Sequence, residues 1–157
     1  MNNIVNFYNT YDEESRVSTN KARKVEFNVT TSILNEYIKC QDNIIELGAG
    51  TGVYSFYYAK RGNEVVATDI TPRNVEVIKE KLNKVSEPIK LHAEVANAID
   101  LKQYDSESFD VVLCLGPMYH LVNEKDRKAC ISENLRILKK GGILAVAYIN
   151  KYYVLNS

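Results

Sequence analysis

Residues 44–52 read Ile-Ile-Glu-Leu-Gly-Ala-Gly-Thr-Gly, an apolar run that ends in an acid and is followed by glycines at positions 48, 50 and 52. A glycine-rich turn directly after a buried strand lets backbone approach a ligand closely, because no Cβ intervenes and a positive φ costs little. The next apolar run closes on Asp69. A carboxylate about 20 residues after such a turn can accept both ribose hydroxyls, so the combination predicts a cofactor that carries adenosine.

Strand and helix patterns alternate along the rest of the chain. The strand patterns are short and rich in Val, Ile and Leu, as in parallel strands buried on both faces. Strands are expected at 43–47, 64–69, 89–95, 109–115 and 142–149, and helices at 21–38, 53–61, 72–84 and 124–139. This order predicts an α/β fold with a Rossmann-like, doubly wound parallel sheet of strand order 3-2-1-4-5.

Local signals refine the helices. In 21–38 the apolar positions recur at steps of three and four and predict a helical face: Val25, Val29, Ile33, Leu34 and Tyr37. Thr71 followed by Pro72 is typical of an N-cap and the first position of a helix. Gly141-Gly142 is expected to end the last helix after Lys139 and Lys140, whose charges suit the negative end of a helix dipole.

Size and charge exclude several classes. A chain of 157 residues and 17.9 kDa is expected to form one domain, with an N-terminal arm and helix over 1–40 and the core over 41–157. Its formal charge is zero and no block of like charges occurs, which predicts no nucleic-acid partner and no membrane surface. Without a leader pattern or an apolar span, the expected location is cytoplasmic.

The cysteines predict no metal site. Cys40, Cys114 and Cys130 are odd in number, with no Cys-x-x-Cys, so neither a disulfide framework nor a zinc site is expected. Cys114 lies inside an apolar run and is interpreted as a small core residue.

The glycine tract fits a dinucleotide poorly. A G-x-G-x-x-G fingerprint counted from Gly48 wants glycine where the chain has Val53, and Glu46 would repel phosphates while suiting a cationic ligand. Two plainer interpretations stay open: Gly48 to Gly52 as a tight strand-to-helix turn, and Asp69 as a cap of the next helix.

These motifs together resemble those of class I S-adenosylmethionine-dependent methyltransferases. The resemblance covers 43–149 and rests on Glu46 to Gly52, on Asp69 and on Leu135-Arg136-Ile137-Leu138-Lys139-Lys140-Gly141-Gly142. Phe109 to Leu121, which includes Gly116-Pro117-Met118-Tyr119-His120-Leu121, resembles the fourth-strand motif of small-molecule-type members, with Met118 in place of leucine.

The resemblance implies S-adenosyl-L-methionine as cofactor and a role for each matching residue. Asp69 would hold the ribose and Ile70 would pack on the adenine, with Asn97 and Ala98 near its amine; Asn97 could equally be a turn residue. The methionine part and its positive end would lie on the turns after the first and fourth strands. The implied cofactor-binding set is Glu46, Gly48, Ala49, Gly50, Thr51, Gly52, Asp69, Ile70, Asn97, Ala98, Leu115 and Gly116.

The acceptor end is less determined. Tyr119 and His120 would point toward the acceptor, and His120 is the better proton acceptor because its ordinary pKa lies near neutrality, although it could equally fix the loop. In the arm, Tyr8, Tyr11 and Arg16 could fold over the cofactor, as in related enzymes.

The predicted function is methyl transfer from S-adenosylmethionine to a small-molecule acceptor. Leu115-Gly116-Pro117-Met118 lacks the Pro-Pro and Pro-Cys motifs of nucleic-acid methylases. The alternatives are a non-catalytic cofactor-binding fragment and, less favoured, an NAD-dependent oxidoreductase. Family members have seven strands, so strands 6 and 7 are expected to be absent here. The apolar strand 142–149 is then expected either to continue into a longer natural protein or to pair across a homodimer.

Overall fold

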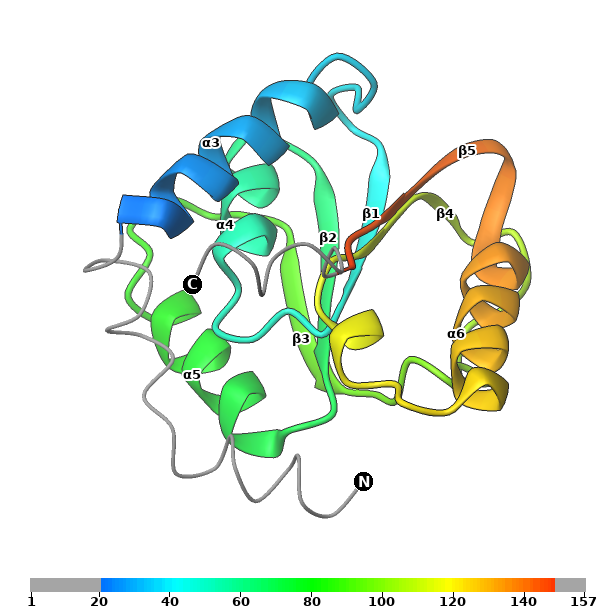
Figure 1. Cartoon of the computed structure of the whole chain (residues 1–157). Coiled ribbons are helices and arrows are strands. Elements are labelled where there is room, and N and C mark those ends of the chain that lie inside the picture. Colours follow the sequence, from blue (N-terminus) through cyan, green and yellow to red (C-terminus); the bar gives the residue numbers. More distant parts are fainter. Residues whose placement is uncertain (1–20, 149–157) are drawn as a thin grey trace.

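The computed structural model describes residues 21–148, which form an α/β fold around a five-stranded parallel sheet (Figure 1). The strand order is β3-β2-β1-β4-β5, so the predicted order is confirmed. The helices are α3 (Lys21–Leu34), α4 (Val53–Lys60), α5 (Pro72–Leu82) and α6 (Glu124–Ile137), with a short 3-10 helix, η1 (Pro117–Tyr119). The strands are β1 (Asn43–Leu47), β2 (Glu64–Asp69), β3 (Leu91–Val95), β4 (Phe109–Cys114) and β5 (Leu138–Val146).

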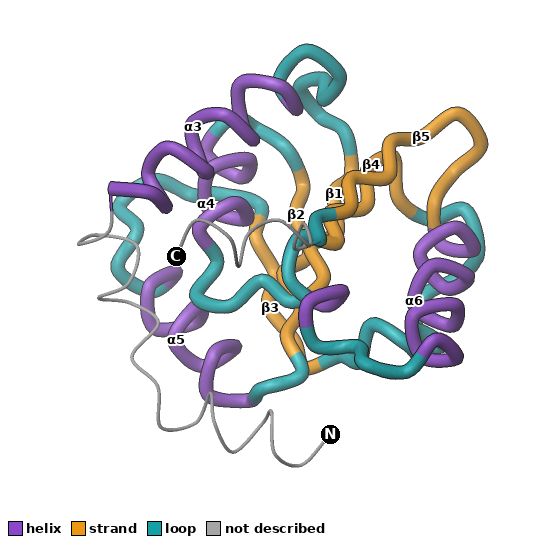
Figure 2. The backbone as a smooth tube through the Cα atoms, viewed as in Figure 1, coloured by secondary structure: helices purple, strands orange, loops and turns teal. Residues whose placement is uncertain are grey.

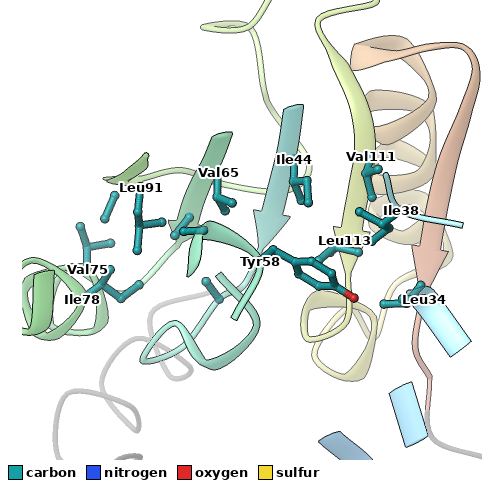
Figure 3. Close-up of a cluster of buried hydrophobic side chains, with 14 residues drawn as sticks. Leu34, Ile38, Ile44, Tyr58, Val65, Val75, Ile78, Leu91, Val111 and Leu113 are labelled. Atoms are coloured by element: carbon teal, nitrogen blue, oxygen red, sulfur yellow. The ribbon is translucent and has the colours of Figure 1, made fainter. Parts of the chain in front are cut away.

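Two hydrophobic clusters hold the layers together, one on each face of the sheet. Helices α3, α4 and α5 cover one face, where alternate strand residues such as Ile44 and Val111 meet Tyr58 and Ile78 (Figure 3). Helix α6 covers the other face over Ile45 and its neighbours, as the tube in Figure 2 shows. Because β1 and β4 are buried on both sides, their continuous apolar runs are the pattern expected of central parallel strands.

The N-terminal helix is confirmed, although it ends at Leu34, and of its predicted apolar face Leu34 alone is buried. Val25, Val29, Ile33 and Tyr37 are between 52% and 61% exposed. The helix packs through Leu34 together with Phe27 and Thr31, which were not in the predicted face, and Ile38 continues that contact after α3 ends. Two apolar sets alternate around this segment, and only the neighbouring layer decides which one is buried.

The predicted junction between the last helix and the last strand is also wrong. Helix α6 ends at Ile137, and Lys139 and Lys140 belong to β5 rather than to a helix terminus. The ammonium of Lys139 lies 2.9 Å from a carboxylate oxygen of Asp110 on β4. The register then shifts between the pairs Phe109–Leu138 and Val111–Ile143, so the glycines lie in a bulge of β5 and not at a helix end.

Other sequence signals are confirmed. Thr71 is the extended N-cap of α5 and Pro72 its first residue. Cys114 is buried in the core, where its sulfur lies 3.8 Å from that of Cys130, and both are free thiols. No helix within residues 21–148 is long and apolar enough to cross a membrane.

Two adjacent tyrosines on α4 give a test of this packing. The hydroxyl of Tyr58 is buried, and no group in residues 21–148 forms a hydrogen bond with it. The Tyr57 hydroxyl accepts a 2.7 Å bond from the amide of Asn35. We expect Tyr58→Phe to raise the free energy of unfolding by about 1 kcal/mol and Tyr57→Phe to lower it by about 1 kcal/mol, measured by urea denaturation. Equal destabilisation by both variants would contradict this packing.

Candidate functional site

A cavity of about 420 Å³ opens where the carboxyl ends of β1, β2 and β4 meet. In an open parallel sheet the strand order reverses at this point, and ligands bind there. All but one of the residues predicted to bind a ligand line it: Glu46, Gly48, Ala49, Gly50, Thr51, Asp69, Ile70, Asn97, Ala98, Leu115, Gly116, Tyr119 and His120. Residues from turns that are far apart in the sequence therefore meet in one cavity.

The glycine turn has the backbone conformation that its sequence predicts. Gly48, Gly50 and Gly52 have φ values of 68°, 56° and 83°, which favour glycine. A Cβ on Gly50 would meet no protein atom within 4 Å, so the turn is open at this residue, which lines the cavity. Gly52 is the one predicted residue that does not line it. A Cβ on Gly52 would lie 3.1 Å from Ile78 on α5, so this glycine permits helix packing.

The turn after β4 lies in close contact with the turn after β1. A Cβ on Gly116 would lie 2.9 Å from the carbonyl oxygen of Gly48, and a Cβ on Gly48 would lie 2.9 Å from the ring of Pro117. Neither contact leaves room for a side chain, since real Cβ atoms do not approach that closely. These two glycines close the floor of the cavity.

Asp69, at the end of β2, links two turns. One oxygen of its carboxylate accepts the backbone N–H of Gly50 at 2.8 Å, and the other accepts that of Thr71 at 2.8 Å. Burial raises the pKa of Asp69, and the two backbone donors oppose that shift. A carboxylate offers about four acceptor positions, and the side chain of Asn74 also hydrogen-bonds to Asp69, so the carboxylate is an acceptor-rich group on the cavity wall. The structure therefore gives Asp69 both a structural bond at the start of α5 and a place in the cavity wall.

Glu46 is a buried acid at the end of β1. Its carboxylate accepts a hydrogen bond from the Ser55 hydroxyl on α4. Burial raises the pKa of Glu46 from 4.5 to about 7, since the Ser55 hydrogen bond only partly offsets the loss of water. A cation in the cavity would favour the ionised form, whereas a phosphate would be repelled by it.

The two remaining loops complete the wall. In the loop after β3, the Asn97 side chain accepts the N–H of Ile99 at 3.3 Å, so the turn interpretation holds for a residue that also lines the cavity. In the loop after β4, η1 places Tyr119 and His120 together, with ring centroids 6.4 Å apart. Tyr8, Tyr11 and Arg16 lie outside the described residues.

Sequence reasoning missed the wall formed by α3. Arg23, Glu26 and Phe27 line the cavity, together with Tyr54 on α4. These residues belong to no recognisable motif, and the apolar face predicted for α3 does not include them. Asn123 and Asp126, at the start of α6, were missed for the same reason.

The residues present fit a cationic adenosine cofactor. Among the described residues, the charged side chains on the wall are the carboxyl groups of Glu26, Glu46, Asp69 and Asp126 and the guanidinium of Arg23, so acids outnumber cations. Such a wall disfavours a pyrophosphate and suits a ligand with positive charge. The glycine turn and Asp69 supply the backbone approach and the acceptor that an adenosyl group needs.

Comparison with known proteins identifies the family to which this site belongs. Residues 45–146 match the sequence profile of the family described as methyltransferase domain. The chain is 36% identical over 110 residues to a ubiquinone biosynthesis O-methyltransferase of Pelagibacter ubique, and 30% identical over 108 residues to one of Xanthomonas oryzae. Each match covers 69% of this chain but only 42% and 43% of the relatives, so the chain spans about two fifths of their length.

Solved structures show the same fold. A SAM-dependent methyltransferase of Methanosarcina mazei superposes with a TM-score of 0.64 at 25% identity, over 68% of this chain and 52% of that one. A protein of Pyrococcus horikoshii gives a TM-score of 0.72 at 21% identity, over 85% and 65%.

The buried acid makes a testable contribution to stability. The raised pKa means that the folded state holds the Glu46 proton more tightly than the unfolded chain does, so stability falls as the pH rises from 4.5 to about 7. We expect Glu46→Gln to be progressively more stable than the wild type over that window, reaching a gain of about 3 kcal/mol above it.

The measurement is urea denaturation of the ligand-free chain at several pH values. Glu64→Gln, at an exposed position of β2, is the matched control and should give no such trend. A stability difference independent of pH would contradict the burial of an ionisable Glu46.

Proposed function

The chain belongs to the methyltransferase-domain family, and on that premise we propose that it binds S-adenosyl-L-methionine and transfers the methyl group to a small-molecule acceptor. The observation that supports this most strongly is the meeting of the glycine turn, Asp69 and the buried Glu46 in one cavity. The turn admits the ligand closely, and the two acids complement a ribose and a positive charge.

The proposal assigns each part of the wall a task. Asp69 would accept ribose hydroxyls, with Ile70, Asn97 and Ala98 around the base. Gly48, Ala49, Gly50 and Thr51 would support the methionine part from one turn, and Leu115 and Gly116 from the other. Glu46 would sit near the positive end, where its ionised form is favoured.

When bound, the cofactor supplies an electrophilic methyl on a sulfonium; the acceptor's lone pair forms the new bond, and the carbon–sulfur electron pair stays on sulfur. The protein then has to orient the acceptor and exclude water. Tyr119 and His120 stand on the loop that contacts the glycine turn, so they are our candidates for positioning. We propose that His120 accepts the proton when the acceptor must lose one.

The acceptor itself does not follow from the relatives. The names of the Pelagibacter and Xanthomonas proteins specify O-methylation in ubiquinone biosynthesis, but the match covers less than half of each. A cofactor-binding fragment without turnover therefore stays the main alternative. An NAD-dependent oxidoreductase is disfavoured by the acidic wall and by Val53 at the fingerprint position.

Ligand titration tests the cofactor and its pose together. We expect saturable binding of S-adenosylhomocysteine by calorimetry, weakened at least about tenfold by Asp69→Asn, because a charged acceptor of hydrogen bonds is lost. Asp105→Asn, at an exposed loop position, should bind as the wild type does. Binding of NAD without S-adenosylhomocysteine would overturn the proposal, and equal affinity in Asp69→Asn would leave Asp69 as a cap only.

We also propose that β5 pairs with a second copy. Among the described strands β5 is hydrogen-bonded to β4 alone, and Ile143, Leu144, Ala145 and Val146 are only partly buried. An open apolar edge is a template for strand pairing. We expect sedimentation velocity of the 157-residue chain to show a dimer over about a hundredfold range of concentration; a monomer throughout would refute this assembly.

A further inference from the structure

We propose that the acceptor carries a basic amine, which an amine subsite formed by Glu26, Phe27, Tyr54 and Tyr119 binds as a cation. This inference rests on the proposed function, since it assigns the acceptor of the same cavity. The four residues come from α3, α4 and η1, and all of them line the cavity.

Aromatic rings form one side of the amine subsite. The Phe27 ring lies 5.2 Å from that of Tyr54 at 40°, and it meets Tyr57 edge-on at 5.4 Å. Tyr57 is held in turn by the bond from Asn35. The rings are therefore fixed by packing before any ligand binds. Aromatic faces attract ammonium groups through their quadrupole, most strongly where water is partly excluded.

Glu26, exposed and next to Phe27 on α3, supplies a carboxylate on the same cavity wall. It lines the cavity with Tyr54 and Tyr119, and its charge adds to the raised pKa of both phenols, of which burial is the main cause. None of the ion pairs between residues 21–148 includes Glu26. An acid beside aromatic rings is a binding site suited to an alkylammonium and poorly suited to a carboxylate or phosphate.

The other charged groups on the wall leave this preference in place. In the proposed pose Glu46 and Asp69 contact the cofactor. Asp126, at the start of α6, and His120, after η1, also line the wall. Arg23, one turn before Glu26 on α3, is the one guanidinium on the described wall. Glu26 and Asp126 outnumber it, so the space beyond the cofactor still favours a cation.

An amine bound in this way must lose one proton before it reacts. Its lone pair then forms the bond to the methyl carbon, the carbon–sulfur pair stays on sulfur, and the released proton passes to His120 or to water. His120 lies on the same wall as the amine subsite, next to Tyr119. The cationic form is thus the form that binds, and the neutral form is the one that reacts.

The test uses two probes of equal shape that cannot be confused with cofactor. The full chain is first saturated with S-adenosylhomocysteine, which fills the cofactor site, and then titrated with choline or with 3,3-dimethyl-1-butanol, its uncharged carbon isostere. We expect choline to bind about tenfold more tightly than the isostere. Glu26→Gln should remove this difference by weakening choline alone.

Glu36→Gln, at an exposed position just after α3, is the control and should leave both affinities unchanged. Equal binding of the two probes would overturn the amine subsite, and so would choline binding that Glu26→Gln does not alter. The first result is also expected if the ammonium of the bound S-adenosylhomocysteine already occupies the subsite, and it counts against the proposal in that case too. Failure of S-adenosylhomocysteine to bind would instead overturn the proposed function and this inference with it.

Discussion

The contact on which the rest of the site depends is the one between the backbones of two turns. Gly48 follows β1 and Gly116 follows β4, and the space between them does not admit a Cβ on either residue. Because β1 and β4 are adjacent parallel strands, both turns leave the sheet at the same edge. A side chain in either place would separate the turns and open the floor of the cavity.

The second feature of the site is a pair of buried carboxyl groups, Glu46 and Asp69, which form no salt bridge with any residue of 21–148. Glu46 is hydrogen-bonded by Ser55, and Asp69 accepts the backbone N–H groups of Gly50 and Thr71, yet burial still raises the pKa of both. A fold selected for stability alone would place apolar side chains there. A ligand that carries a positive charge and hydroxyl groups would offset the burial of these carboxyl groups, since it would supply an opposite charge and hydrogen-bond donors.

Where the sequence misled, two patterns competed and long-range packing chose between them. On α3 the stripe through Val25 and Val29 and the stripe through Phe27 and Thr31 both have helical spacing, and packing against α4 buries the second together with Leu34. At the end of α6, Lys139 suits a helix terminus, but Leu138 already pairs with Phe109 of β4, and Lys139 forms an ion pair with Asp110 of that strand. Neither choice can be made from residues that are neighbours in the chain.

The sequence by itself determined the alternation of strands and helices, the glycine turn and the acids at the ends of β1 and β2. These features are local, because a strand's hydrophobic run, a positive φ and a helix cap each depend on a few adjacent residues. Only the tertiary structure decided that Gly52 packs against α5 rather than facing the cavity, that Glu46 is held by Ser55, and that Glu26 and Phe27 join Tyr119 on one wall. Those relations join residues as far apart in the chain as Glu26 and Tyr119, and their energies arise only when the layers pack.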